Sequence, residues 1–193
     1  KFNPNMLRGY PSSLYEFAKF IEGNHQVEEL NLTNIVTDSE TLLDSQREYL
    51  QDIFKTKVYD SYGQWEHVCL IAECNFQNKH HLMEHGILEL LGGNNTRVNN
   101  GELGEITATG FYNKAMPLIR YKNRDLAVRN ETVCQCGRAH DVIKRIDGRI
   151  EDIIITPGSS LMLHMHTITE ECIIDKLYEY DIKNKKITNK SIT

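Results

Sequence analysis

The chain has 193 residues, which is enough for one domain or for one domain with part of a second. Hydrophobic residues make up 40% and charged residues 25%, a composition that excludes disordered and fibrous proteins. The net charge is −5 and the 22 Lys and Arg residues are scattered along the chain, which argues against a nucleic-acid partner and favours a small-molecule one.

The sequence predicts neither a membrane span nor a secretory leader. The longest apolar runs, such as Ile153 to Ile155, fall far short of the roughly 20 residues that cross a bilayer. The segment Lys1 to Arg8 lacks the apolar core and cleavage site of a secretory signal, and the five cysteines are an odd number. We therefore expect a cytoplasmic protein, in which closely spaced cysteines are metal ligands or reactive thiols more often than disulfides.

The first part of the chain is predicted to form a helix, a strand and a second helix. Ser13 and Glu16 have the spacing of a capping box, at the start of an apolar-periodic helix that ends at Gly23. Spaced branched residues predict a strand over Leu30–Val36. The stretch Thr37–Glu40 is then expected to cap a second helix that ends near residue 54.

The middle of the chain is predicted to be rich in β-structure, because short apolar runs alternate with glycines and polar turns. A short strand at Lys57–Tyr59 is expected to break at Ser61–Gly63. The strands expected after it are Val68–Ala72, Ile87–Leu91, Gly101–Phe111, Met116–Tyr121 and Asp141–Ile146.

The pattern breaks again at Asp147-Gly148-Arg149, and we place a domain boundary near residue 148. The first domain is then residues 1–147 and the second is residues 148–193. The second is expected to open with a hairpin and a helix, over Ile153–Thr156, Leu161–Leu163 and Thr167–Tyr180.

Three turns that follow apolar strands carry side chains suited to a nucleotide. Tyr62 and Glu66 flank a glycine turn, where a ring can lie against a base and an acid can face a metal-bound phosphate. Asp125 can accept hydrogen bonds from paired ribose hydroxyls, and Arg149 can hold a phosphate or ribose. Taken singly, each is better explained as an ordinary turn or a charged surface loop.

Four other residues have the chemistry of a zinc site. Cys134 and Cys136 place two thiolates one residue apart, and Cys74 is followed six positions later by His80. Tetrahedral zinc prefers thiolate and imidazole ligands, so these four would close a structural site that joins two loops. His81 is the alternative fourth ligand.

In order and spacing, these motifs resemble the adenylate-forming ligases, and specifically the phenylacetate-CoA ligase branch with its capsular polysaccharide biosynthesis (CapK-like) relatives. The resemblance runs from about Leu7 to Leu177. It implies an α/β fold: the rear part of the large layered AMP-binding domain, with a β-rich subdomain, and the start of the small C-terminal α/β domain. The motifs that carry it are Arg8–Ser12, Thr37–Glu40, Tyr62–Glu66, Gly101–Ile106, Met116–Tyr121 with Asp125, Cys134–Arg138 and Gly148-Arg149.

The resemblance also implies a role for each candidate residue. Tyr62 would stack on adenine, Glu66 would be the catalytic carboxylate that helps hold magnesium at the phosphates, and Asp125 would bind the ribose. Arg149 would contact the nucleotide and Glu151 would be the hinge between the large and small domains. In such enzymes the domains rotate between adenylation of a carboxylate and attack by the CoA thiol.

Three departures qualify the resemblance. Asn123-Arg124 stand where the family usually has Thr-Gly before the ribose-binding Asp, no Ser/Thr/Gly-rich phosphate loop is present, and no lysine can be assigned as catalytic. We therefore expect a fragment of an ATP-dependent, AMP-forming carboxylate:CoA ligase that is inactive alone. The expected ligands are ATP or AMP, Mg²⁺, CoA, a small carboxylic acid and a structural Zn²⁺. The alternatives are a CapK-like relative with a non-CoA product and a non-catalytic, zinc-stapled scaffold.

Overall fold

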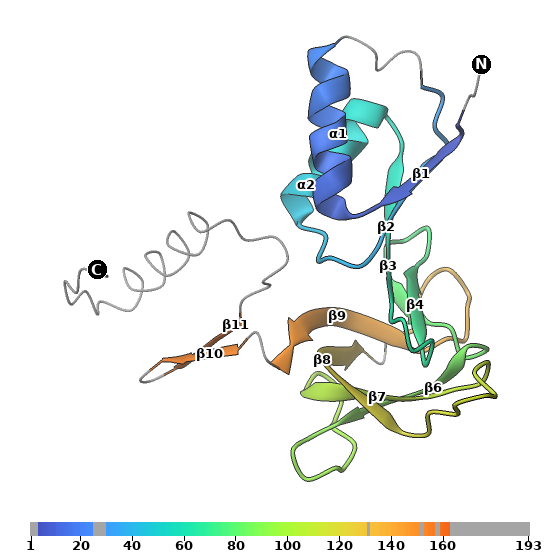
Figure 1. Ribbon diagram of the computed structural model, residues 1–193, viewed down its shortest axis with the longest axis vertical. Coiled ribbons are helices and arrows are strands. Elements are labelled where there is room, and N and C mark those ends of the chain that lie inside the picture. Colours follow the sequence, from blue (N-terminus) through green and yellow to red (C-terminus); the bar gives the residue numbers. More distant parts are fainter. Residues whose placement is uncertain (1–3, 25–29, 131, 151–152, 157–158, 163–193) are drawn as a thin grey trace.

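The computed structural model describes residues 4–24, 30–130, 132–150, 153–156 and 159–162. These residues form the predicted α/β fold, in which two helices accompany a mixed sheet of nine strands and a separate two-stranded ribbon. Figure 1 shows the helices with the first strands at one end of the molecule and the β-rich part at the other. No helix among the described residues is long and apolar enough to cross a membrane.

The α/β part is a parallel sheet covered by two helices. Strands β1, β2 and β3 pair in parallel, and the helices α1 and α2 follow β1 and β2 along the chain. Apolar residues from both helices and from the strands form one core, as expected for amphipathic helices on a sheet: Leu14, Ala18, Ile21, Ile35, Leu50, Ile53, Phe54 and Val58. The bounds are β1 (Met6–Gly9), α1 (Pro11–Gly23), β2 (Asn34–Thr37), α2 (Asp44–Phe54) and β3 (Lys57–Gly63).

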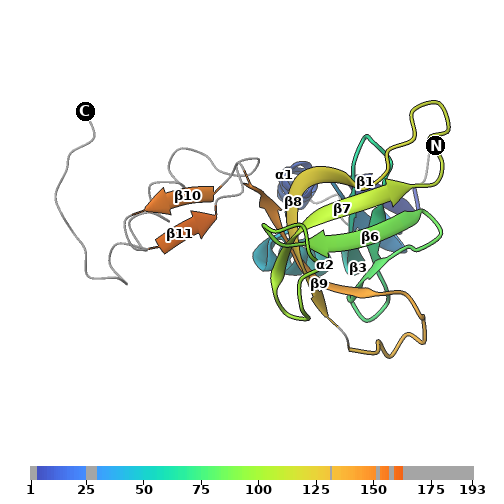
Figure 2. The same cartoon turned by 90° about the horizontal axis from the view of Figure 1, so that it is seen from below.

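The β-rich part is an antiparallel continuation of the same sheet. Strand β3 belongs to both parts, because residues 57–60 pair in parallel with β2 and residues 61–63 pair antiparallel with β4. The whole sheet has the order β1-β2-β3-β4-β5-β9-β8-β7-β6, and Figure 2 shows β6, β7 and β8 side by side. The remaining bounds are β4 (Leu70–Glu73), β5 (Lys79–His81), β6 (Gly86–Leu91), β7 (Leu103–Gly110), β8 (Tyr121–Asn130) and β9 (Val142–Arg149).

The two helices are present as predicted, but their predicted caps are wrong. Helix α1 begins at Pro11, whose missing N–H suits the first helical position, so Ser13 and Glu16 lie inside the helix. The amide and hydroxyl of Ser12 instead donate hydrogen bonds to the Glu40 carboxylate, at 3.1 and 3.0 Å. Helix α2 begins at Asp44, and the stretch Thr37–Glu40 forms the end of β2 and the loop after it.

Several strand bounds also differ from the prediction. Met116–Tyr121 is a loop up to residue 120, because Pro117 has no N–H for a ladder and Arg120 adopts a φ of +50°. The predicted break at Ser61–Gly63 is wrong, since β3 continues there to pair with β4. The predicted break at 147–149 is also wrong, because β9 continues to Arg149 opposite Asp125.

The C-terminal hairpin is confirmed. Strands β10 (Ile153–Thr156) and β11 (Ser159–Met162) pair antiparallel, and Figures 1 and 2 show them apart from the large sheet. The hinge residue Glu151 and the helix predicted over 167–180 lie outside the described residues. The domain boundary near residue 148 stays a prediction.

Candidate functional site

Tyr62, Asp125 and Arg149 lie together, although they come from three different strands. The Tyr62 hydroxyl at the end of β3 donates a hydrogen bond to Asp125 Oδ2 on β8, at 2.5 Å. Arg149, at the end of β9, faces Asp125 across the strand pair, with 3.4 Å between its Nε and Asp125 Oδ1. The Asp125 side chain is largely buried and the Arg149 side chain is exposed. The structure thus brings the three predicted nucleotide-binding residues into one cluster.

Asn123 joins this cluster and was not predicted as a site residue. Its Nδ2 donates to the Tyr62 hydroxyl at 2.5 Å and to Asp125 Oδ2 at 3.1 Å. Its Oδ1 accepts a hydrogen bond from the backbone N–H of Asp125 at 3.0 Å. The only sequence signal was the departure from the Thr-Gly pair, and the residue that replaces the glycine, Arg124, has a φ of +67°.

Glu66 lies in the turn after β3 and contacts the same strand, β8. Its Oε1 accepts a hydrogen bond from the hydroxyl of Tyr121 at 2.8 Å, and this bond raises the pKa of Tyr121. The turn is closed by a hydrogen bond from the His67 amide to the carbonyl of Gln64 at 3.1 Å. Mg²⁺ in nucleotide sites is commonly held by one or two carboxylates and the substrate phosphates, so the half-buried Glu66 suits that role.

The electrostatics of the cluster keep Tyr62 neutral. Burial, followed by the charge of Asp125, raises the pKa of Tyr62, so its hydroxyl stays protonated and can donate. Burial also raises the pKa of Asp125, whereas the Tyr62 hydrogen bond and the charge of Arg149 act in the opposite direction. An ionised Asp125 with a neutral phenol and a guanidinium beside it is an acceptor site for hydroxyl groups.

The cluster lies just beyond the carboxyl ends of the parallel strands. Ligands of α/β sheets usually bind at such ends. There the Thr37 hydroxyl donates to Asp60 Oδ1 at 2.8 Å, and the Ser61 hydroxyl donates to the Thr37 carbonyl at 3.0 Å. Arg8, near the end of β1, pairs with Asp38, the first residue after β2, at 2.7 Å. Three of the stretches that carried the resemblance, Arg8–Ser12, Thr37–Glu40 and Tyr62–Glu66, therefore begin near this edge.

The four predicted metal ligands also lie together. Their donor atoms, on Cys74, His80, Cys134 and Cys136, are all within 4.8 Å of one another. The Sγ atoms of Cys74 and Cys134 are 3.6 Å apart, and Cys136 Sγ is 3.4 Å from His80 Nε2. The alternative ligand His81 is not in the group, because neighbouring residues of a strand point to opposite faces of the sheet.

The hydrogen bonds around these residues suit a metal site. His80 Nδ1 is 3.3 Å from the carbonyl oxygen of His140, a partner that would leave Nε2 free as a ligand. Asn78 Nδ2 and the amide of Cys136 lie 3.2 and 3.5 Å from Cys134 Sγ, as donors to a thiolate. The hydrogen bond to the Arg138 backbone lowers the pKa of Cys136 to about 7. Three thiolates and one imidazole fit a closed, tetrahedral zinc ion.

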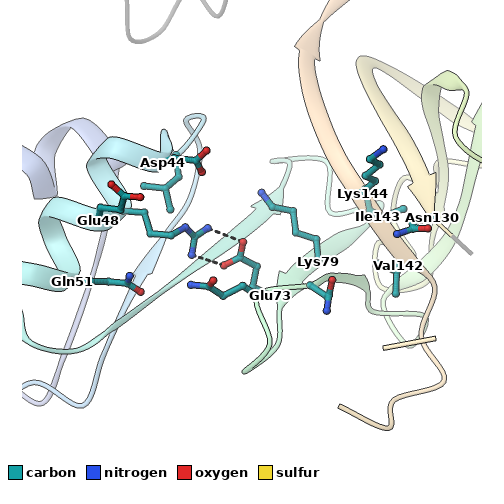
Figure 3. A pocket seen from close by; sticks show the side chains of 13 residues that line it. Asp44, Glu48, Gln51, Glu73, Lys79, Asn130, Val142, Ile143 and Lys144 are labelled. Atoms are coloured by element: carbon teal, nitrogen blue, oxygen red, sulfur yellow. Dashed lines mark hydrogen bonds and ion pairs between the residues drawn. The ribbon is translucent and has the colours of Figure 1, made fainter. Parts of the chain in front are cut away.

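A polar cleft of about 540 Å³ lies between α2 and strands β4, β5 and β9. Arg47 of α2 donates two hydrogen bonds to the Glu73 carboxylate, at 2.9 and 2.7 Å. Figure 3 shows Glu73 among the side chains that line the cleft, between Glu48 and Lys79. Glu73 also accepts a hydrogen bond from the backbone amide of Asp60 at 2.8 Å, and the Lys79 ammonium forms an ion pair with the Asp60 carboxylate at 2.6 Å. These buried charges tie the α/β part to the β-rich part, and the sequence analysis did not predict them.

No known protein-family profile matches the chain. Two curated proteins are similar in sequence: Protein CapK of Staphylococcus aureus, 28% identical over 193 residues, and phenylacetate-coenzyme A ligase of Thermus thermophilus, 28% identical over 163 residues. The chain is thus similar in sequence to members of the phenylacetate-CoA ligase and CapK branch of the adenylate-forming enzymes. The alignments cover 95% and 81% of this chain, but only 41% and 37% of the two relatives.

Solved structures of CoA ligases have the same fold as the described part of this chain. 2-Hydroxyisobutyryl-CoA ligase in the postadenylation state, in complex with 2-HIB-AMP, superposes with a TM-score of 0.74 at 19% identity. That match covers 82% of this chain and 35% of the ligase. Anthranilate CoA ligase AuaEII in complex with anthranoyl-AMP gives a TM-score of 0.58 at 14% identity, over 93% of this chain and 43% of that one. The predicted fold, part of a ligase domain, is confirmed.

Proposed function

We propose that this chain is part of an ATP-dependent, AMP-forming carboxylate:CoA ligase of the phenylacetate-CoA ligase type. The observation that carries the proposal is the cluster of Tyr62, Asp125 and Arg149 beyond the carboxyl ends of the parallel strands. It is supported by structural neighbours that were solved with acyl-adenylates and CoA. We also propose that the protein acts in the cytoplasm on a small carboxylic acid.

Each residue of the cluster has a part in binding the nucleotide. The ring of Tyr62 lies against adenine, the Asp125 carboxylate accepts the ribose hydroxyls, and the exposed Arg149 contacts the phosphate or ribose. Glu66 supplies one carboxylate to the Mg²⁺ that is held with the phosphates. These groups position the nucleotide and stabilise charge, which is most of what such a site contributes to adenylation.

The cysteine cluster has a structural part in this proposal. A zinc ion with four protein ligands has no open position for a substrate or a water, so it does not act as a Lewis acid. It joins the loop between β4 and β5, through Cys74, to the loop between β8 and β9, through Cys134 and Cys136. Strand β8 leads into the second loop and β9 leads out of it, and these strands carry Asp125 and Arg149. The ion would therefore hold in place the two strands that support the nucleotide site.

A CapK-like relative with a different acceptor is the second candidate. It is favoured by the alignment with CapK, which covers 95% of this chain against 81% for the phenylacetate-CoA ligase. Both candidates share the adenylation step and differ in the group that attacks the acyl-adenylate. A protein that contains this chain and releases pyrophosphate with an acid and ATP, but needs no CoA for turnover, would favour the second. A zinc-stapled scaffold would release no pyrophosphate.

The direct test is nucleotide binding by the chain itself. Calorimetric titration with AMP should show binding, and Asp125→Ala should weaken it at least tenfold, because a charged hydrogen bond contributes about 1.5 to 3 kcal/mol. Asp52→Ala is the matched control, since Asp52 is an exposed carboxylate on α2 that pairs with Lys55, the residue after the helix. Equal AMP affinity in wild type and Asp125→Ala would remove the basis of the assignment.

A further inference from the structure

We propose that Asn123 is a positioning residue that fixes the Asp125 carboxylate and the Tyr62 hydroxyl for ribose recognition. The inference rests on the proposed function, because it assumes a nucleotide at this cluster. It goes further by naming a residue that the resemblance does not assign, at a position where the family usually has Thr. The Asn123 side chain makes three hydrogen bonds, two from its amide nitrogen and one to its amide oxygen.

The three bonds restrict both ligand-binding groups at once. Asp125 Oδ2 accepts from the Tyr62 hydroxyl and from Asn123 Nδ2, so the carboxylate is held through one oxygen by two donors. The Tyr62 hydroxyl donates a hydrogen bond to Asp125. Its oxygen accepts hydrogen bonds from Asn123 Nδ2 at 2.5 Å and from Gln64 Nε2 at 3.3 Å. A threonine hydroxyl has a single proton to donate, so it cannot serve the phenol and the carboxylate together.

The backbone explains why this side chain reaches the cluster. In the pairing of β7 with β8, Thr107 lies opposite Lys122 and Glu105 lies opposite Leu126, so residues 123–125 face the single residue Ile106. Such a bulge redirects side chains, and bulges are frequent beside active sites. Arg124 completes it with a φ of +67°, the conformation that glycine adopts most easily. Asn123 Oδ1 caps the turn by accepting the Asp125 amide at 3.0 Å.

Two substitutions separate positioning from simple support of the turn. Asn123→Asp is nearly isosteric and keeps an oxygen for the Asp125 amide, but it loses the Nδ2 donor and adds a charge beside the carboxylate. Asn123→Ala loses both functions. A role in the turn alone predicts that the Asp variant behaves like wild type, whereas positioning predicts that both variants fail. Asn113→Ala is the control, because Asn113 Oδ1 also accepts a backbone amide, from Met116 at 3.0 Å, in an exposed loop.

The readout is the preference for AMP over 2′,3′-dideoxy-AMP, measured by calorimetry on the full chain with circular dichroism as a check of folding. Wild type and Asn113→Ala should prefer AMP, and both Asn123 variants should lose about tenfold or more of that preference, the worth of one hydrogen bond to a charged group. An Asn123→Asp chain that is folded and keeps the wild-type preference would overturn the inference alone. If wild type binds neither nucleotide, the proposed function fails as well.

Discussion

The nucleotide cluster (Tyr62, Asn123, Asp125 and Arg149) and the cysteine cluster (Cys74, His80, Cys134 and Cys136) differ in how complete they are. Both join segments that lie about 60 residues apart in the sequence. In the nucleotide cluster the phenol, amide and carboxylate already satisfy one another with hydrogen bonds. In the cysteine cluster the four donor atoms lie within 4.8 Å of one another, and two of the pairs are 3.4 and 3.6 Å apart, which is too long for covalent links and suits atoms around a common ion.

This difference indicates what each cluster contributes. A network that satisfies itself can be formed before a ligand arrives and can exchange its hydrogen bonds with ribose, so it suits reversible binding. Thiolates that lie this close repel one another unless a cation binds between them, so the cluster suits a permanent ion that stabilises the fold. We therefore expect changes in the cysteine cluster to act mainly on stability and changes in the nucleotide cluster to act mainly on binding.

Removal of the metal should give the largest effect. We expect about one zinc per chain, with sulfur about 2.3 Å and nitrogen roughly 2.0 to 2.1 Å from the ion. Chelation, or Cys134→Ser, should lower the free energy of unfolding by on the order of 5 kcal/mol, because the binding energy of a structural zinc is part of the folding energy. Metal analysis by mass spectrometry and thermal melts measure both quantities.

The control for this experiment is Cys69→Ala. Cys69 is a buried thiol outside the cluster, next to Gln64, and burial raises its pKa to about 11. It should keep full zinc content, even though the melt shifts modestly because a small cavity is formed. A metal-replete crystal structure in which the four predicted side chains lie far apart would refute the zinc site.

Glu73→Gln should have the next largest effect and tests whether the two clusters are independent. Glu73 precedes Cys74 in the sequence and accepts hydrogen bonds from Arg47 and from Asp60, two residues before Tyr62. Its side chain is only 3% exposed, so the change leaves the Arg47 charge buried with a neutral partner and should cost about 3 kcal/mol. Zinc content should stay at one per chain. Loss of the metal in a folded Glu73→Gln chain would show that the clusters are coupled.

The sequence predicted the residues of both clusters better than it predicted the backbone around them. Ligand types and spacing pointed to Cys74, His80, Cys134 and Cys136, because few side chains bind zinc and their spacing is visible. Asn123 was missed because its role depends on a bulge, which comes from the pairing of β8 with β7 and not from any local pattern.

The helices were predicted better than the strands, because β8, the longest strand of the described residues, was not predicted: its first half, Tyr121–Asp125, is polar and has no apolar alternation. The two helices and β6 follow strong apolar periodicity, and the structure contains them. Strands β1 and β5 have four and three residues, too few to give a periodic signal, and they exist because a neighbouring strand supplies hydrogen bonds. The ion pair of Arg47 with Glu73 joins two parts of the fold and could not be found from spacing.

Asp125→Asn should move stability and binding in opposite directions at neutral pH. Burial raises the pKa of Asp125, so the folded chain holds a proton on this carboxyl more tightly than the unfolded chain does. The contribution of Asp125 to stability is therefore fully favourable below the ordinary pKa of 3.8 and is lost as the pH rises through the higher pKa of the folded state. The variant should melt at a higher temperature than wild type at pH 7, and AMP affinity should fall.

The difference in melting temperature should shrink as the pH is lowered toward 3.8, since wild type is then protonated as well. The neighbouring groups that act on the pKa of Asp125 are Tyr62, Arg149 and Glu66. A difference that stays constant across this range would mean that burial of the charge does not govern the effect.

Arg124→Gly should give the smallest effect and should raise stability. Arg124 is exposed and has a φ of +67°, a conformation that costs a residue with a Cβ about 1 kcal/mol and costs glycine nothing. Glycine also loses more freedom on folding, so the net gain should be about 0.5 kcal/mol, or roughly 1 to 2 °C in the melt of a chain of this size.

Lys122→Gly is the matched control. Lys122 is exposed on the same strand and its φ is not positive, so glycine there should lower stability by about 0.5 to 1 kcal/mol through the backbone, and loss of the contacts of Lys122 with Glu105 and Asn95 adds to this cost. Opposite signs for the two glycines would support a strained bulge that holds Asn123 in place, whereas equal destabilisation would show that the conformation of Arg124 is not strained.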